Sequence, residues 1–422
     1  MSHTIKALVL IIVLHFQPAA GWTAEPVLML DRLIEEALAA NPQIETARQR
    51  AAAARQQVPQ AGALEDPMLG FGVLNVPDNF DLDAEDMTSK EITLSQQVPF
   101  IGKRRLRREA AEQMAEAARE ESSDTANQVI REVKLAFFDL SHVHRATQVT
   151  RRNKTILEDF SRLAQTRYSV GEGIQEDVIR VQVDISRMVD ELLMLDQRRR
   201  ALEARLNMLR NRPSEEPLGA PEELPFQART IDVERLQQAA MRTSPMLNAL
   251  ARETDSREKE FLLAGRERFP DFNLRFSYGQ REDRRDMYSA MVEMNLPVFA
   301  RSKQNRQVDE AAAELSGQKA RLTSARNELF FTIADLGAMA GRLERQVELY
   351  RTGIIPQTTM QIQSAMSAYT VNKADFMTLL DSRMRLYRFE LDYHQAVTEY
   401  AKTIAALEAA LGATLESVQE YR

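Results

Sequence analysis

The chain has 422 residues, a formal net charge of −7, 28% charged and only 6% aromatic residues, and no cysteine. The negative charge argues against nucleic acid as a partner, and the lack of cysteine excludes disulfides, thiolate metal ligands, cysteine nucleophiles and a lipid anchor on an N-terminal cysteine. A composition rich in charged and poor in aromatic residues favours a mainly helical, coiled-coil chain over a β-sandwich.

The N-terminus predicts a secretory signal over residues 1–24. Lys6 precedes the apolar run Ala7–Leu14, which is too short to span a bilayer as a helix, and small residues follow it. Cleavage after Gly21 and cleavage after Ala24 both fit, and a buried N-terminal helix is the alternative interpretation. No later stretch reaches about 18 consecutive apolar residues, so a membrane role would need β-strands or peripheral attachment.

Residues 25–212 form the first of two predicted repeats. Apolar spacing predicts helix from Leu30 to Gln60, restarted at Pro42, where a missing N–H costs nothing, and ended before Pro59. The apolar period then changes from 3.6 to 2, which predicts a β-hairpin over residues 68–100. Each of its strands, Met68–Val76 and Glu91–Phe100, has the length of a tilted membrane strand, about 9–11 residues, and the loop between them is acidic.

A long helical hairpin is predicted over residues 103–212, with its tip at Tyr168–Asp177. Its return arm has a heptad seam at Val178, Val181, Ile185, Met188, Leu192, Leu195, Leu202, Leu206 and Leu209. The first arm, Lys103–Tyr168, would be roughly 100 Å long. Its basic start, Lys103–Arg108, opposes the helix dipole. Contact with anionic lipid head groups and a solvated helical face are the two explanations.

Residues 213–229 are a proline-rich predicted linker, and the whole pattern then starts again over residues 230–422. The second repeat has a helix from Val233 to Asn248 restarted at Pro245, a β-hairpin over residues 271–297 and a long helical hairpin over residues 301–412. Its strands are Phe272–Tyr278 and Met287–Leu296, its basic opening is Arg301, Lys303 and Arg306, and its tip lies near Tyr369–Lys373. A direct repeat with a period of about 200 residues indicates a duplicated structural unit.

Four strands cannot close a barrel, and an open sheet edge in lipid leaves backbone groups without hydrogen bonds. If the strands lie in a membrane, several chains must share one barrel, because small closed barrels begin near eight strands. The hairpins would continue that barrel as a helical tube deep enough for the gap between two membranes. The predicted fold class is therefore mainly α with membrane β.

Two motifs, Gly62–Pro67 and Gln97–Arg104, together with the duplicated strand–strand–hairpin unit, resemble the TolC family of outer-membrane efflux ducts over nearly the whole mature chain. The resemblance implies a homotrimer in the lipid of a Gram-negative outer membrane, with a shared twelve-stranded β-barrel continued by a periplasmic α-helical barrel. It also implies two partners, a periplasmic adaptor (membrane fusion) protein and an inner-membrane pump. The second motif is most similar to members paired with heavy-metal or cation resistance-nodulation-division pumps.

The resemblance also assigns roles to residues. It places adaptor docking at the two tips and a ring of carboxylates, selective for cations, at the pore entrance. The docking residues are Tyr168, Val170, Gly171, Glu172, Gly173, Tyr369, Val371, Asn372 and Lys373, and the entrance residues are Glu176, Asp177, Asp375 and Asp381. Plain helix–helix turns and ordinary solvated acids are the alternatives. Arg167, Arg180 or Arg383 could pair with the entrance acids and hold the pore shut.

The sequence thus predicts a passive exit duct for metal cations or small toxic compounds. A periplasmic coiled-coil scaffold or adaptor, and the exit duct of a type I protein secretion system, are the alternatives. No nucleophile–base grouping, phosphate loop or metal-ligand spacing occurs, so no enzyme, cofactor or metal site is predicted. His142 and His144 are two residues apart on a helix and do not face each other, and His394 is expected to be a packed residue.

Overall fold

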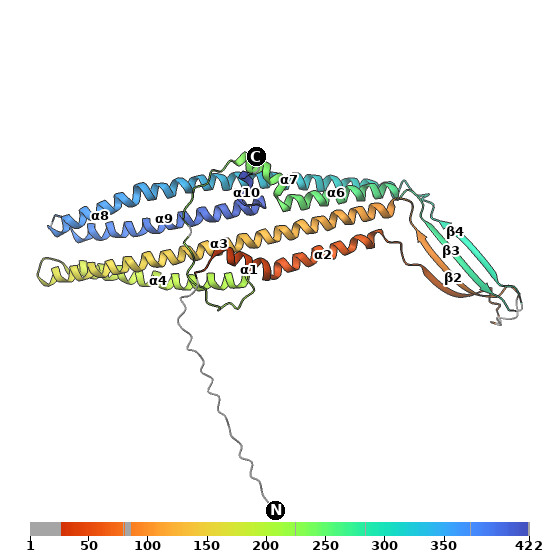
Figure 1. The fold of residues 1–422 in the computed structure, drawn as a ribbon, viewed down its shortest axis with the longest axis horizontal. Helices are drawn as coiled ribbons and strands as arrows, with labels where there is room; N and C mark the ends of the chain where they lie inside the picture. The colour runs from red at the N-terminus through yellow and green to blue at the C-terminus, as the bar shows by residue number, and fades with distance from the viewer. Residues whose placement is uncertain are drawn as a thin grey trace, which may run out of the picture.

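The computed structural model describes residues 27–78, 80, 86–223, 225–282, 284–371 and 373–420. The predicted signal segment, part of the acidic loop between the first two strands, and Asn372 lie outside the described residues. Figure 1 shows an elongated molecule with a β-sheet at one end and the turns of two long helical hairpins at the other. Both repeats run along the length of the molecule, so their corresponding elements lie side by side.

The sheet is antiparallel, with its strands in the order β1 (Met68–Leu74), β2 (Ser89–Val98), β3 (Phe272–Gln280) and β4 (Met287–Met294). Residues paired across strands share a face. One face carries the row Phe71, Ile92, Tyr278 and Tyr288, of which all but the half-buried Tyr278 are exposed, and the opposite face carries the polar row Thr93, Ser277 and Ser289. β1 and β4 are the outer strands, so each has one edge unpaired among the described residues.

The helices of the first repeat are α1 (Leu30–Ala40), α2 (Pro42–Gly62), α3 (Lys103–Ser169) and α4 (Gln175–Leu209). Asn41 starts α2, because its Oδ1 accepts a hydrogen bond from the Gln43 N–H at 2.8 Å. The predicted helix end before Pro59 is wrong, since α2 continues to Gly62. Pro59 cannot bond to the Arg55 carbonyl, but both residues are exposed, so water can hydrogen-bond to that carbonyl.

The helices of the second repeat are α5 (Val233–Thr243), α6 (Pro245–Arg266), α7 (Gln304–Leu349), the π-helical segment η1 (Tyr350–Ile354), α8 (Ile355–Thr370), α9 (Phe376–Leu411) and α10 (Leu415–Glu420). Arg301 and Lys303 do not open the long helix as predicted, because turns occupy residues 298–303. The arm is also interrupted by η1, which the periodicity does not predict. Pro356, the second residue of α8, has no N–H to donate to the Thr352 carbonyl.

The long helices form a layer with α3 and α9 at its centre. α3 packs against α4 and α9, and α9 packs against α7 and α8 (Figure 1). The heptad seam of α4 lies on the packed side, where Val181, Met188, Leu195, Leu206 and Leu209 are buried. α4 is therefore one edge of the layer and α7–α8 is the other. None of the described helices is both long and apolar enough to cross a membrane.

The linker between the repeats packs against both of them. The Glu222 carboxylate accepts a hydrogen bond from the Leu30 N–H at 2.8 Å. Farther along, the Arg229 N–H donates to the Tyr400 hydroxyl on α9 at 2.9 Å. The linker therefore crosses from α1 to α9.

The basic start of α3 is compensated within the chain. The Lys103 side chain is 1% exposed, and its Nζ lies 2.8 Å from Glu267 Oε2 and 2.9 Å from Asp271 Oδ1. Both acids belong to the second repeat, where Glu267 is the C-cap of α6 and Asp271 directly precedes β3. Lys103 therefore neither contacts lipid head groups nor lies on a solvated helical face, the two predicted explanations. Arg105 does lie on a solvated face, with its Nε 3.4 Å from Glu109 Oε1.

Candidate functional site

The first tip, between α3 and α4, lies at the end of the molecule far from the sheet (Figure 1). The helix ends in a Schellman-type turn, in which the Glu172 N–H donates to the Arg167 carbonyl at 2.9 Å and Gly171 has a φ of +78°. Glycine favours this left-handed backbone because it has no Cβ. Gly173 is needed for a different reason, since a Cβ there would lie 3.1 Å from the backbone nitrogen of Tyr168.

The second tip, between α8 and α9, has no glycine among its described residues. The Lys373 N–H closes the turn by donating to the Ala368 carbonyl at 2.8 Å. Asp375 caps α9, because its carboxylate accepts a hydrogen bond from the Thr378 N–H at 2.8 Å. The hydrogen bonds from Thr378 lower the pKa of Asp375, which keeps this carboxylate charged. The predicted docking residue Asn372 lies outside the described residues.

The two tips contact each other through Arg167. Its guanidinium carbon lies 4.6 Å from the centre of the Tyr369 ring, and its Nη1 donates to the Tyr369 carbonyl at 3.3 Å. Its Nη2 lies 3.6 Å from Glu172 Oε2. Tyr369 is buried, with its ring centroid 5.8 Å from that of Phe376. Tyr369 therefore supports the tip from inside rather than presenting its ring to a partner.

Apolar side chains are exposed at both tips. Val170 is 65% exposed and Val371 is 61% exposed, and Tyr168 and Ile174 are each about half exposed. Sequence reasoning missed Ile174, although it directly follows Gly173. Exposed apolar side chains gathered at the end of a charged hairpin favour contact with another protein.

The four predicted entrance acids do not form one cluster within a single chain. Desolvation, and then the negative charges of Glu176 and Asp375, raise the pKa of Asp177. Glu176 instead lies 3.8 Å from Arg180 in an exposed ion pair. The Asp381 carboxylate is exposed and makes no hydrogen bond or ion pair with the described residues.

Arg383 does not pair with any of the predicted entrance acids. Its guanidinium is buried between α9 and α3, where Nε donates to Asn153 Oδ1 at 2.8 Å. Burial lowers the pKa of Arg383, and its Nη2 has no hydrogen-bond partner among the described residues. Farther along α9, the Tyr387 hydroxyl lies 3.0 Å from the Thr150 hydroxyl of α3. These polar contacts join the second hairpin to the first behind the tips.

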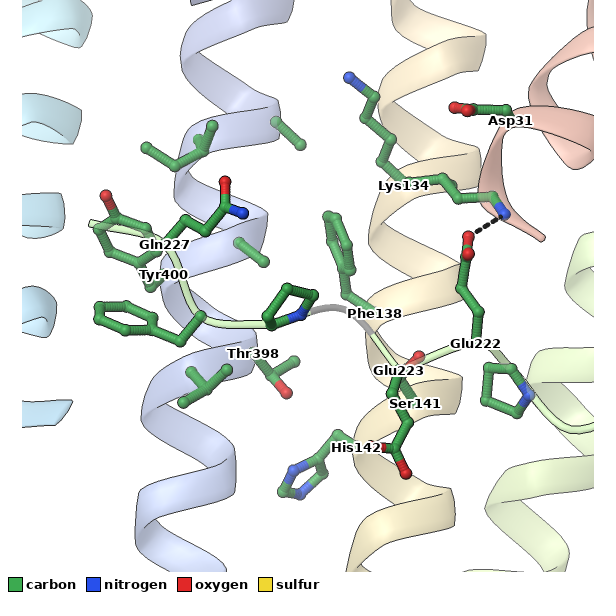
Figure 2. A pocket seen from close by; sticks show the side chains of 18 of the residues that line it. Asp31, Lys134, Phe138, Ser141, His142, Glu222, Glu223, Gln227, Thr398 and Tyr400 are labelled. Atoms are coloured by element: carbon green, nitrogen blue, oxygen red, sulfur yellow. Dashed lines mark hydrogen bonds between the residues drawn. The ribbon is translucent and has the colours of Figure 1, made fainter. Parts of the chain in front are cut away.

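A cavity of about 820 Å³ lies beneath the linker, between α3 and α9 (Figure 2). Figure 2 shows Glu222 and Glu223 of the linker beside α3, with the Glu222 side chain directed toward Asp31 and the Glu223 side chain directed toward His142. Lys134 and Glu408, which also line the cavity, form an ion pair at 2.7 Å. Burial and neighbouring positive charges lower the pKa of His394, another lining residue, to about 4. No group of three or more His, Cys, Asp or Glu suited to a metal ion occurs among the described residues.

Known proteins resemble this chain over most of its length. The family described as outer membrane efflux protein matches residues 33–211 and 236–413, one segment in each repeat. Among solved structures, CusC is 15% identical over 94% of this chain and 96% of that chain, with a TM-score of 0.79. VceC from Vibrio cholerae is 17% identical over 91% and 96%, with a TM-score of 0.78. MtrE from Neisseria gonorrhoeae, in its open state, is 19% identical over 92% and 89%, with a TM-score of 0.75. No curated protein matches the chain.

Proposed function

This chain belongs to the outer membrane efflux protein family, the TolC-type family that its sequence motifs indicate, and from that premise we propose that it is the passive exit duct of a tripartite efflux system. Proteins of this family are outer-membrane channels that extend into the periplasm, and they are transport ducts rather than enzymes. The chain is therefore an outer-membrane efflux channel. In the proposed system a partner pump supplies the energy and this chain supplies the path.

The observation that best supports a duct is a two-faced sheet joined to very long hairpins. In the apolar row, Phe71, Ile92 and Tyr288 are exposed and suit contact with lipid, whereas the row of Thr93, Ser277 and Ser289 suits a water-filled interior. α3 follows the sheet directly and has 67 residues, which gives a length of about 100 Å. Such a chain can cross a membrane and reach far into the periplasm.

Several copies are proposed to share one barrel, because a single sheet leaves an edge of β1 and an edge of β4 without hydrogen bonds. The helical layer has matching free edges, since Ile179 and Leu193 on α4 and Phe331 on α7 are exposed apolar side chains. When the β1 and α4 edges of one copy meet the β4 and α7 edges of the next, the contact is heterologous and can close into a ring.

Three copies are proposed because of the space that the barrel must leave. Two copies would supply about eight strands, and the interior of so small a barrel is filled by side chains or holds one small ligand. Three copies would supply twelve strands, which leaves room for cargo to pass. We therefore propose a homotrimer whose helical hairpins continue the barrel as a tube.

The proposed cargo is metal cations or small toxic compounds. In a ring of copies, Asp177, Asp375 and Asp381 would each recur around the entrance at the hairpin tips. Rings of carboxylates attract cations and repel anions. The net charge of −7 agrees with a path that favours cations.

The proposed partners are a periplasmic adaptor protein, docked at the tips, and an inner-membrane pump. Val170, Ile174 and Val371 offer exposed apolar surface for docking. A Cβ built at Gly171 would meet nothing within 4 Å, so the backbone of the first tip is open to close approach.

Membrane fractionation, followed by a mass measurement on the detergent-extracted particle, tests the duct. The expected result is an outer-membrane particle of near three times the 48.0 kDa chain, detergent aside. A monodisperse single chain in the periplasm would contradict the proposal. The sensitivity of a deletion strain to metal salts and toxic compounds then tests the cargo, with the complemented strain as its control.

A further inference from the structure

Within one chain, a buried cluster locks the end of β2 to the start of β3. Lys103 lies within ion-pair distance of Glu267 and Asp271, and its Nζ donates to the Phe269 carbonyl at 3.1 Å. The Phe100 ring stacks on the Phe269 ring with centroids 4.6 Å apart. Strands from different repeats are thereby fastened together at the point where the sheet meets the helices.

The second repeat presents the same kind of positive charge without a partner. β4 is followed by Arg301 and Lys303, as β2 is followed by Lys103. The side chains of Arg301 and Lys303 are exposed and make no ion pair or hydrogen bond with the described residues. Next to them, Gln304 has a buried Oε1 with no hydrogen-bond partner among the described residues.

The matching negative charge lies at the other edge of the sheet. Glu65 and Asp66 precede β1, as Glu267 precedes β3, and both are exposed without a side-chain partner among the described residues. The Glu65 carbonyl accepts a hydrogen bond from Gln96 Nε2 at 2.8 Å, so this segment is held against β2. β1 and β4 are opposite edges of the sheet, so these acids and the cations after β4 sit on opposite sides of one chain.

We propose that Glu65 and Asp66 of one copy pair with Arg301 and Lys303 of the next copy. The inference rests on the proposed ring of copies, because the ring places β1 of one copy beside β4 of the next. Two features support it. The charges are complementary and lie at the same level, where each free edge of the sheet meets the helices. The β2–β3 junction is an occupied example of the same pairing within the chain. Arginine suits such an interface because it stays charged and binds a carboxylate through two parallel hydrogen bonds.

The lack of cysteine in the chain permits a direct test. Asp66→Cys and Arg301→Cys are placed in differently tagged copies, which are co-expressed, extracted from the outer membrane and treated with a short bis-maleimide. The expected result is a covalent product that carries both tags. The control replaces Arg301→Cys by Lys319→Cys, an exposed position on α7 that lies roughly 22 Å beyond the start of that helix at Gln304 and should give no such product.

Two outcomes separate this inference from the proposed duct. A particle of trimer mass that yields no product above the control would overturn the pairing and leave the duct intact, whereas a particle of single-chain mass would overturn the duct itself. Charge exchange gives a second readout. Arg301→Glu should lower the temperature at which the trimer band is lost on a gel, and adding Asp66→Arg should restore it. If the double variant is no better than the single variant, the pairing is wrong.

Discussion

Lys103 is a fully buried cation whose partners come from the other repeat. Its side chain is held by Glu267 and Asp271 at distances of 2.8 and 2.9 Å. The two acids are partly exposed, so removing the lysine would not strand a fully desolvated charge. Lys103 therefore links the two repeats, although a lysine is usually expected on the surface.

Replacing Lys103 by methionine is expected to lower the free energy of unfolding by about 2–3 kcal/mol per chain. Breaking a fully buried ion pair from one side costs about 3–5 kcal/mol, and the partial exposure of the two acids reduces that value. Thermal unfolding of the extracted protein measures the change. The control is Arg105→Met, which breaks only the exposed pair with Glu109 and should cost less than about 1 kcal/mol. Equal losses in both variants would contradict the account.

His394 makes the stability of the protein depend on pH. Burial, and then the positive charges of Arg145, His142 and Arg152, lower the pKa of His394 from 6.5 to about 4. Between these two values the unfolded chain binds the proton more readily than the folded chain. The contribution to stability is therefore full above pH 6.5 and is lost as the pH falls toward 4, with a ceiling of about 3 kcal/mol per chain.

Denaturation of the intact protein and of His394→Gln, at a series of pH values from neutral to about 4, measures this contribution. The glutamine variant should lose less stability than the intact protein across that range. The same loss in both proteins would assign the acid sensitivity to other groups.

The two helical tips differ although the hairpins that carry them are repeats. The first tip depends on Gly171 in the left-handed region, whereas the described part of the second tip depends on the Asp375 cap. A partner that contacts both tips of a chain therefore meets two different surfaces.

Gly171→Ala is expected to destabilise the protein by about 1–2 kcal/mol, because an L-residue with a Cβ disfavours the left-handed backbone. Gly317→Ala is the matched control. Gly317 lies inside α7 and a Cβ there meets nothing within 4 Å, so alanine should stabilise the helix by about 0.5–1 kcal/mol. Both changes are measured by thermal unfolding. Opposite signs are expected, and a stabilising Gly171→Ala would refute the assigned turn geometry.

Most elements could be predicted because their signals are local. The α4 seam, the alternation of β2 and the helix restarts at Pro42 and Pro245 can each be read within a few turns of chain. The error at Pro59 has a physical cause, because a proline near a helix end is tolerated when water reaches the freed carbonyl, and solvent access is a property of the fold. The segment η1 was missed because the helical periodicity continues on both sides of it.

The candidate site was less predictable because it depends on contacts between the repeats. The exposure of Val170 and Val371 follows from their place in turns. The burial of Tyr369 depends on how the end of α8 packs against Arg167 of α3 and Phe376 of α9. The contact of Arg383 with Asn153 depends on which face of α9 meets α3, and no single helix carries this information alone. The partners of Lys103, more than 160 residues away in the chain, were hidden for the same reason.

The assembled trimer is proposed to carry a ring of negative charge at its pore entrance. A ring of Asp381 carboxylates should attract cations to the entrance. Asp381→Asn is therefore expected to lower the ratio of cation to anion permeability, and to move the reversal potential measured under a salt gradient in a planar bilayer toward zero. Asp392→Asn, an exposed position on the same helix, is the control. If both variants keep the selectivity of the intact channel, the proposed entrance is not at Asp381.

The unpaired edges of β1 and β4 also mean that a copy can aggregate before it is assembled with its neighbours. β1 reads Met-Leu-Gly-Phe-Gly-Val-Leu and contains no charge or proline that would discourage pairing with a stray strand. A copy that has not yet met its neighbours therefore exposes an adhesive edge, and strand-to-strand aggregation competes with correct closure. Closure of the barrel needs a full set of copies, whereas aggregation needs only two. The amount of finished channel therefore depends on the relative rates of the two processes. Slow delivery to the membrane, more than any weakness of the finished ring, should then limit how much channel a cell can make.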